Sequence, residues 1–255
     1  MKIALLQFDT IWEDKQKNLS YVSDSIDKLD RDTDLVVLPE MFTTGFSMLP
    51  ERSAELENGP TFHTIQQLAL KYQTAITGSW ITEEEEQYYN RLYFIYPDGS
   101  YKTYDKRHLF TLSGEQKVYE GGTHKSIVSY KGWNICPLIC YDLRFPVYSR
   151  IVDEDYDLLL YIASWPDRRI FAWDSLLKAR AIENMSYLIA VNRCGSDPSG
   201  VEYSGHSQAL DPMGGYIVEP MEGISTCTIK LDKNMLTELR SKFNFLRDAD
   251  SFELK

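Results

Sequence analysis

Short apolar runs alternate with amphipathic segments along both halves of the chain, and this alternation restricts the fold more than any other feature. Five runs have the length and apolar content of buried strands, namely residues 2–8, 35–38, 74–80, 157–163 and 187–192. Apolar spacing predicts helices over 15–29, 61–72 and 170–185, and a further helix from about Pro146. Such alternation is typical of layered α/β folds, in which helices cover the faces of a sheet.

Hairpins are expected between these elements, so the sheets are predicted to be mixed. Three pairs of strands are predicted, covering residues 88–96 and 100–104, 126–130 and 133–139, and 206–210 and 216–218. Gly99 and Gly132 supply the positive φ angle that the first two turns need. The acidic run 83–86 predicts a solvated turn, and a last strand is expected over 225–231.

The composition is that of a globular protein without a nucleic-acid or membrane partner. We predict a single domain over residues 1–255, since 43% of them are hydrophobic and no linker interrupts the pattern. The net charge of −11 and the scattered basic residues argue against nucleic acid. Every apolar run falls short of the roughly 18 residues of a membrane span. The tail, about 234–255, is expected to pack on the body or on a partner subunit.

The beginning of the sequence and its cysteines favour the cytoplasm. Only four apolar residues lie between Lys2 and Gln7, too few for a secretory signal. Four cysteines in a chain of this length fit a reducing compartment better than a disulfide framework. We therefore expect a cytoplasmic protein.

Three side chains with catalytic chemistry follow predicted strands. Cys140 ends the apolar run 133–140, where a thiol is held on a rigid element and can still face a cleft. Glu40 follows the buried run 35–39, and a carboxylate that is poorly hydrated on one side suits a general base. Lys106 comes just after a hairpin strand. An acid, a base and a thiol at strand ends form a reaction centre if the fold brings those ends together.

Each of these residues also has a structural interpretation. Glu40 can cap the turn that follows it, and Lys106 can form a surface ion pair. A cysteine at a strand end is commonly a small core residue, and we keep this interpretation for Cys136, Cys194 and Cys227.

Metal binding and a papain-like mechanism are weaker alternatives. Cys136 and Cys140 share one strand face, but a closed zinc site needs four ligands and none follows nearby, so no metal is expected. A papain-like Cys-His pair lacks its local signature around the cysteine. The histidines available for such a pair are His63, His108, His124 and His206.

Taken together, three segments match the motifs of a known family. They are Leu38-Pro39-Glu40-Met41-Phe42, Tyr104-Asp105-Lys106-Arg107-His108-Leu109-Phe110 and Ile139-Cys140-Tyr141-Asp142-Leu143-Arg144-Phe145-Pro146. Any one of them is weak alone, but all three occur in this order. On these motifs the sequence resembles the nitrilase, or carbon–nitrogen hydrolase, superfamily, from Lys2 to at least Gly214.

The resemblance implies a four-layer αββα sandwich with mixed sheets and a Glu-Lys-Cys triad that needs no cofactor. Carried over to this chain, Glu40 is the general base, Lys106 stabilises the oxyanion and Cys140 is the nucleophile. The backbone N–H of Tyr141 is a second expected donor to the oxyanion. A nearby Lys106 is also expected to lower the pKa of the Cys140 thiol.

A second glutamate is expected beside the lysine. Related enzymes carry one in the stretch after the lysine, where it orients the lysine and the substrate. Glu115 is the favoured match, and Glu120 competes with it because the loop length varies. The structural alternative for Glu115 is a solvated loop acid.

The branch most similar to this chain is that of the omega-amidases, which hydrolyse the terminal amide of small 2-oxo acids such as 2-oxoglutaramate and 2-oxosuccinamate. The similarity lies in four segments, residues 40–47, 163–166, 179–184 and 192–197. The alternatives are another amidase, carbamoylase or acyltransferase of the family acting on a different small amide. A non-catalytic binding protein is disfavoured, since it has no need to keep all three triad residues.

The expected substrate is a small amide with a carboxylate, which requires a cationic end in the pocket. Arg144, close behind the nucleophile, is the candidate to bind it. Phe42, Trp165 and Phe171 are candidates for the pocket wall. The structural alternatives are a buried arginine that ties loop carboxylates and aromatic residues of the core. The family further implies a homodimer.

Overall fold

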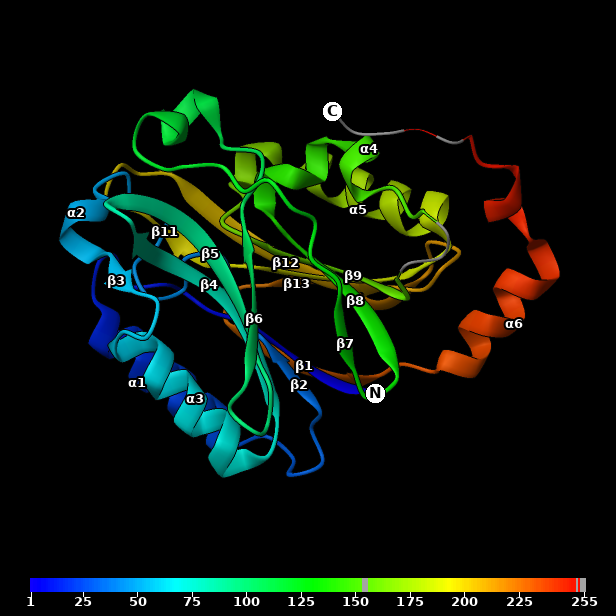
Figure 1. Cartoon of the computed structure of the whole chain (residues 1–255), viewed down its shortest axis with the longest axis horizontal. Helices are drawn as coiled ribbons and strands as arrows, with labels where there is room; N and C mark the ends of the chain where they lie inside the picture. Colours follow the sequence, from blue (N-terminus) through cyan, green and yellow to red (C-terminus); the bar gives the residue numbers. More distant parts are fainter. Residues whose placement is uncertain (153–155, 251, 253–255) are drawn as a thin grey trace.

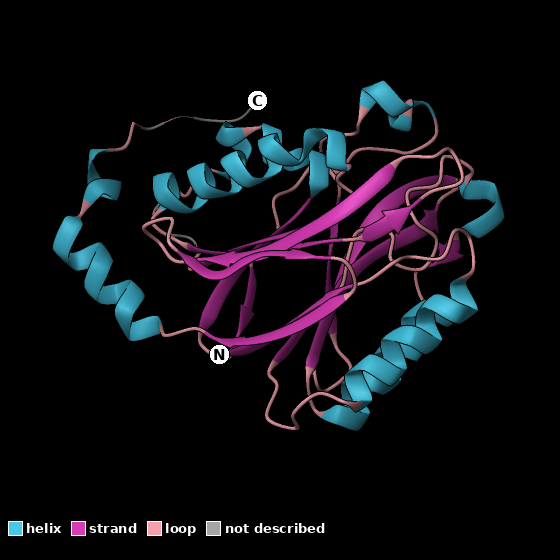
Figure 2. Cartoon of the chain, turned by 180° about the vertical axis from the view of Figure 1, so that it is seen from behind, coloured by secondary structure: helices cyan, strands magenta, loops and turns pink. Residues whose placement is uncertain are grey.

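Two mixed β-sheets packed face to face form the centre of the computed structural model, which describes residues 1–152, 156–250 and 252. Helices α1 (Lys15–Asp27) and α3 (Pro60–Tyr72) cover the outer face of one sheet. Helices α4 (Pro146–Ser149) and α5 (Ile170–Asn184) cover the other sheet (Figure 1). Figure 2 shows the same succession of layers from behind. The predicted four-layer αββα sandwich is therefore confirmed.

The first sheet has the strand order β14-β1-β2-β4-β5-β6, with β3 beside β4. Its strands are β1 (Lys2–Gln7), β2 (Leu35–Val37), β3 (Glu55–Leu56), β4 (Ala75–Glu84), β5 (Gln87–Ile95), β6 (Tyr101–Asp105) and β14 (Ser225–Lys230). The central strands β1, β2 and β4 run parallel, β14 pairs antiparallel with β1, and β5 pairs antiparallel with both β4 and β6.

The second sheet has the order β11-β12-β10-β9-β8-β7, with β13 beside β12. Its strands are β7 (Val128–Tyr130), β8 (Trp133–Ile139), β9 (Leu158–Ala163), β10 (Tyr187–Asn192), β11 (Cys194–Ser196), β12 (Glu202–Leu210) and β13 (Tyr216–Glu222). Again the central strands β8, β9 and β10 run parallel. Both sheets are thus mixed, as the hairpins predicted.

The central strands are apolar on both faces because each face packs against a layer. In β1, Ile3 and Leu5 belong to the core between the sheets, whereas Ala4 and Leu6 pack with Val22 of α1 in the outer core. Alternate residues of a strand point to opposite faces, so this division follows from the strand period. It also explains why these strands appear in the sequence as continuous apolar runs.

Two expectations for local structure are wrong in detail. Glu83 and Glu84 continue β4 and pair with Tyr88 and Gln87, so the turn consists only of residues 85–86. Both turn residues have positive φ, as a two-residue hairpin of this twist requires. The helix expected from Pro146 is the single turn α4, which ends where Arg150 becomes extended.

The remaining helices are short or peripheral. They are α2 (Pro50–Ser53), α6 (Lys233–Phe243) and the 3₁₀ turns η1 (Thr111–Ser113), η2 (Glu115–Lys117), η3 (Cys140–Arg144), η4 (Asp167–Arg169) and η5 (Phe245–Asp248). Helix α6 lies at one side of the molecule (Figure 1), where Leu236 joins the core and Arg240 donates to the carbonyls of Met185 and Tyr156. Among the described residues, no helix combines the length and apolarity that crossing a bilayer requires.

Candidate active site

The ends of strands from both sheets meet at one end of the sandwich. Glu40 and Lys106 come shortly after β2 and β6 of the first sheet, and Cys140 and Ser164 directly follow β8 and β9 of the second. In α/β sheets, sites form where the carboxyl ends of strands lie together. The three candidate residues of the triad are far apart in sequence but are brought into one cluster.

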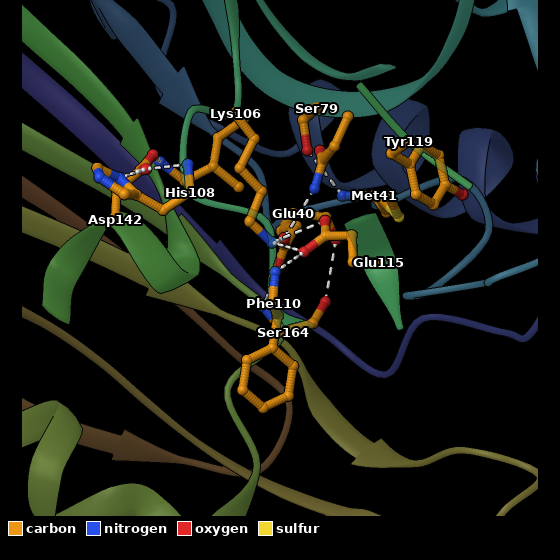
Figure 3. Close-up of polar contacts among 12 residues, drawn as sticks. Glu40, Met41, Ser79, Lys106, His108, Phe110, Glu115, Tyr119, Asp142 and Ser164 are labelled. Carbon is orange, nitrogen blue, oxygen red and sulfur yellow. Dashed lines mark hydrogen bonds and ion pairs between the residues drawn. The ribbon is translucent and has the colours of Figure 1, made fainter. Parts of the chain in front are cut away.

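Lys106 is at the centre of this cluster. Its side chain is fully buried, and Nζ lies 2.8 Å from Glu40 Oε1 and 2.9 and 3.0 Å from the two Glu115 oxygens (Figure 3). Burial opposes the charge, but the Glu115 and Glu40 carboxylates outweigh it and raise the pKa of Lys106. The lysine is therefore held as an ammonium ion between two carboxylates.

The Glu40 carboxylate is fixed by three donors. Besides Lys106, Asn90 Nδ2 donates to Oε1 at 2.8 Å, and the Ser164 backbone N–H donates to Oε2 at 2.7 Å. The sequence analysis missed both residues. Ser164 directly follows a buried strand, so a search for polar residues at strand ends could have found it. The only signal for Asn90 is that it is a polar amide among the buried residues of β5.

Cys140 adopts a backbone conformation that is rare outside glycine. Its φ angle is +45°, which turns the chain sharply from β8 into η3. Such a conformation costs on the order of 1–3 kcal/mol in a residue with a side chain and persists only where the surroundings impose it. The residue is 9% exposed and lines the cavity described below.

Lys106 lowers the pKa of the Cys140 thiol, as expected, but other groups outweigh its effect. Burial raises the pKa of the thiol well above its usual value, and the negative charge of Glu40 adds to this increase. Lys106 does lower the pKa, but by less than the other two causes raise it. The surroundings of the resting sulfur therefore favour the neutral thiol over the thiolate.

Glu115, and not Glu120, lies beside Lys106. Glu115 is fully buried and accepts a hydrogen bond from the Phe110 backbone N–H as well as from the lysine (Figure 3). Burial raises the pKa of its carboxyl, Lys106 opposes this rise, and the Glu40 charge adds to it. Glu120 is exposed, and its backbone N–H donates to Tyr88.

A cavity of about 350 Å³ opens onto the cluster. Its charged lining consists of Lys106, Arg144, Arg168, Arg169 and Asp197. Its other walls are Trp12, Phe46, Ser47, Met48, Leu49, Phe110, Ser113, Cys140, Tyr141, Ser164, Trp165, Pro166, Ser199, Val201 and Tyr203. The space is that of a small molecule, enclosed by mostly apolar walls that also carry several cations.

Arg144 and Trp165 both line the cavity and contact each other. The guanidinium carbon of Arg144 lies 5.0 Å from the centre of the Trp165 ring. The Arg144 side chain is exposed, and within residues 1–152 and 156–250 it forms no ion pair with a carboxylate. The alternative of a buried, structural arginine is therefore wrong. Arg169 stacks similarly over Phe110, at 4.9 Å.

Phe42 and Phe171 do not line this cavity, which corrects the expected pocket wall. Phe42 is fully buried beneath the site and packs edge-on against Trp80, with ring centres 5.9 Å apart. Phe42 follows Met41, which has a positive φ (44°), and packs in the outer core with residues of α1 and α3. Phe171 is 83% exposed on the outer surface of α5.

Within the described part of the chain, no group of three His, Cys, Asp or Glu side chains is arranged to hold a metal ion. The histidines considered for a Cys-His pair have other partners in two cases. His108 Nδ1 lies 2.7 Å from Asp142, and His206 Nδ1 lies 2.9 Å from Asp174.

Comparisons with known proteins agree with this geometry. The family model for carbon-nitrogen hydrolases matches residues 2–241. The chain is 40% identical over 256 residues to the omega-amidase YafV of Escherichia coli K12, covering 100% of this chain and 98% of that protein. It is 33% identical to the 2-oxoglutaramate amidase of Bacillus subtilis 168, covering 91% of this chain and 92% of that protein.

A solved structure is also similar over the whole chain. The protein XC1258 of Xanthomonas campestris, a CN-hydrolase superfamily protein with an arsenic adduct in its active site, superimposes with a TM-score of 0.97. It is 40% identical, and the match covers 100% of this chain and 99% of that one. This chain therefore belongs to the carbon–nitrogen hydrolase family, within the nitrilase superfamily, and is a hydrolase that acts on the carbon–nitrogen bonds of amides.

Proposed function

We propose that this amidase hydrolyses the terminal amide of small 2-oxo acids, such as 2-oxoglutaramate and 2-oxosuccinamate, through a thioester on Cys140. One observation carries the proposal: the cavity that Cys140 lines is also lined by Arg144, Arg168 and Arg169. A substrate with an amide at one end and a carboxylate at the other fits this cavity, because its amide can lie at Cys140 while its carboxylate contacts an arginine. The names of the E. coli and B. subtilis relatives support the same class.

In the proposed first step, Glu40 accepts the thiol proton while the sulfur attacks the amide carbon. The raised pKa of the Cys140 thiol favours a proton transfer that is coupled to attack, since a free thiolate is costly beside Glu40. Protonation of Glu40 removes one negative charge from the cluster. The charge of the Lys106 ammonium is then no longer offset by Glu40, so it can stabilise the oxygen that becomes negative.

The oxyanion is proposed to accept hydrogen bonds from Lys106 and from the backbone N–H of Tyr141. Lys106 contacts both oxygens of Glu115, so it can give up one of these contacts and still remain paired. The Tyr141 N–H lies at the start of η3, where an amide has no partner within its helix. Donors fixed in advance where charge develops are worth about 3 kcal/mol each in well-measured cases.

Collapse of the intermediate breaks the carbon–nitrogen bond. Protonated Glu40 donates its proton to the departing nitrogen, which leaves as ammonia, and the acyl group stays on the sulfur. Glu40, again a carboxylate, removes a proton from a water molecule that attacks the thioester. This second step releases the carboxylic acid and returns the proton to the thiol, so the cycle consumes one amide and one water.

The direct test is ammonia release from 2-oxoglutaramate, 2-oxosuccinamate, glutamine and asparagine. We expect the two 2-oxo acids to be preferred, and Cys140→Ala to lower turnover by at least about 10³-fold because no other group replaces a nucleophile. Cys227→Ala, a change at a half-buried thiol on β14, is the control that keeps full activity. Preferential hydrolysis of a nitrile or a carbamoyl amino acid, or transfer of the acyl group to an amine, would contradict the proposed substrate and reaction.

The proposed site of action is a reducing cytoplasm. Cys140, Cys194 and Cys227 carry free thiols. A mechanism that depends on the Cys140 thiol requires that this sulfur stays reduced.

A homodimer is proposed on the basis of one exposed apolar surface, which we call the α4–α5 face. It comprises Val147 of α4, Phe171 and Ile182 of α5, and Met213 beside Ile182, with exposed fractions of 52%, 83%, 51% and 47%. Phe171 and Ile182 are about three helical turns apart, so they lie on the same side of α5. Large exposed apolar patches in globular proteins commonly mark interfaces.

A further inference from the structure

Asp142 is a buried carboxylate next to Cys140 that the proposed chemistry does not use. It lies in η3, and no part of it is exposed. Burying an ionised carboxylate is costly unless its oxygens accept hydrogen bonds or pair with a cation. The groups around Asp142 therefore indicate what it does.

Four groups surround the two oxygens of Asp142. Oδ1 accepts from the His108 backbone N–H at 3.0 Å and lies 2.7 Å from His108 Nδ1 (Figure 3). Oδ2 accepts from the Tyr104 hydroxyl at 2.7 Å and from the Ile139 backbone N–H at 2.9 Å. A carboxylate has room for about four such contacts, so both oxygens are fully used.

These partners are close in sequence to Lys106 and Cys140. Tyr104 and His108 flank Lys106 in the segment that leaves β6 of the first sheet, and Ile139 immediately precedes Cys140 at the end of β8 of the second. The same two segments also meet through rings, because His108 stacks on Phe145 with ring centres 3.8 Å apart and planes 8° apart.

The contacts of Asp142 help to hold the strained backbone of Cys140 in place. A residue with φ of +45° relaxes unless its neighbours hold it. Asp142 contacts the residue just before this turn through its side chain, and its own carbonyl accepts from the Phe145 N–H, just after η3. The carboxylate thus holds the strained turn and joins it to the lysine segment.

We propose that Asp142 is a positioning residue that sets the relative placement of the Cys140 sulfur and the Lys106 ammonium by joining the ends of the two sheets. This inference rests on the proposed thiol mechanism and adds a residue to it. Asp142 touches no reacting atom, so its effect is exerted through the two segments that it holds together.

The test is Asp142→Asn, which keeps the shape but replaces one acceptor oxygen with an NH₂ group. In either orientation the new NH₂ group faces a backbone N–H, of His108 or of Ile139, which can only donate, so the connection loosens. We expect kcat per titratable Cys140 thiol to fall about 10- to 100-fold, the size of effect that a shift of about 1 Å produces, with KM unchanged. The rate of alkylation of Cys140 by iodoacetamide, followed on its peptide by mass spectrometry, should change as well, because the position of the sulfur relative to Glu40 and Lys106 influences the pKa of the thiol.

Asp157→Asn is the matched control. Asp157 is also a buried carboxylate of the second sheet, but it accepts from Asn134 at the opposite end of β8 and from Lys233 of α6. This variant should lose thermal stability without losing kcat per titratable thiol. If Asp142→Asn also keeps kcat per thiol within about twofold, changes only KM, or leaves the alkylation rate unchanged, Asp142 is merely structural and the proposal fails.

Tyr104→Phe decides the matter if Asp142→Asn does not fold. It removes one donor to Asp142 and leaves the carboxylate, so a smaller loss of kcat per thiol is expected, and wild-type kcat would overturn the proposal. The alkylation rates need no substrate. They therefore test the placement of the thiol even if the wild-type protein hydrolyses no 2-oxo amide, an outcome that would contradict the proposed function alone.

Discussion

At the scale of single residues, the balance of charge around Cys140 decides how the thiol is activated. Glu40 and Glu115 bring two negative charges to a buried cluster that holds one ammonium group, Lys106. Such a cluster does not stabilise a resting thiolate. It supports the proposed mechanism, in which a neutral thiol gives its proton to Glu40 only as the sulfur attacks, in contrast to enzymes in which a neighbouring cation keeps the sulfur ionised.

Replacing Glu40 with Gln should therefore separate thiol acidity from catalysis. Turnover should fall by about 10²- to 10⁴-fold, the usual contribution of a general base. The pKa of the Cys140 thiol should fall at the same time, because the Glu40 charge that raises it is gone and the Lys106 charge that lowers it remains. Initial rates of ammonia release measure the first effect, and the pH dependence of alkylation at Cys140 measures the second.

The wild-type protein is the reference for that pH dependence. Its alkylation rate should keep rising at pH values above the ordinary range of a cysteine thiol, and the Glu40→Gln midpoint should lie lower. A midpoint that moves upward in the variant would show that Glu40 does not penalise the thiolate.

Glu115 and Glu120 form a natural pair of variants. Glu115→Gln should lower kcat about 10- to 100-fold, since a hydrogen bond to a charged group contributes about 1.5–3 kcal/mol and the Lys106 contact loses its charge. Glu120→Gln should leave kcat unchanged, because this side chain is exposed. Steady-state kinetics on both variants tests the assignment, and a reversed pattern would move the second carboxylate to Glu120.

The sequence could predict the site residues that lie in recognisable motifs, but not those whose positions depend on the folded backbone. Glu40, Lys106 and Cys140 follow runs that predict strands, but their convergence was predicted only through the resemblance of their motifs to the carbon–nitrogen hydrolases. Phe42 was placed wrongly because one backbone angle, the positive φ of Met41, decides its direction. Asn90 of β5 contacts Glu40, which follows β2, past the intervening strand β4, and no local pattern reveals such a contact.

At the scale of elements, helical period explains the second misplaced aromatic residue. Trp173 and Leu177 of α5 are buried against the second sheet. Phe171 precedes Trp173 by two residues, which is about 200° around a helix, so it must point away from the sheet. The sequence predicted the helix correctly, but only a known buried face determines which of its aromatic residues can line a cavity.

The turn η3 is predicted to bind the substrate carboxylate through Arg144. Arg144→Gln should raise KM for 2-oxoglutaramate about 10- to 100-fold with little change in kcat, because it removes a charge-assisted hydrogen bond made equally in the ground and transition states. A neutral amide of similar size, such as butyramide, serves as control and should show no change in KM. Equal increases for both substrates would indicate that Arg144 acts through its packing on Trp165.

At the scale of the whole molecule, the sandwich buries its inner faces but leaves the α4–α5 face apolar. The inner layers were predictable because their residues must satisfy packing within one chain. The outer surface of α5 carries no such requirement, so the sequence pattern alone treats Phe171 and Ile182 as ambiguous. Their exposure in the folded chain is what makes them candidates for an interface between two copies.

We predict that Phe171→Glu and Ile182→Lys, each introduced singly, convert a dimer into monomers at micromolar concentration. A buried interface residue of this size commonly contributes about 2 kcal/mol or more, which weakens association at least about 30-fold. Ile224→Lys, in the β13–β14 turn and 64% exposed, is the matched control and should leave the mass unchanged. Sedimentation equilibrium measures the masses; a monomeric wild-type chain, or a dimer that survives both substitutions, would exclude the α4–α5 face as its interface.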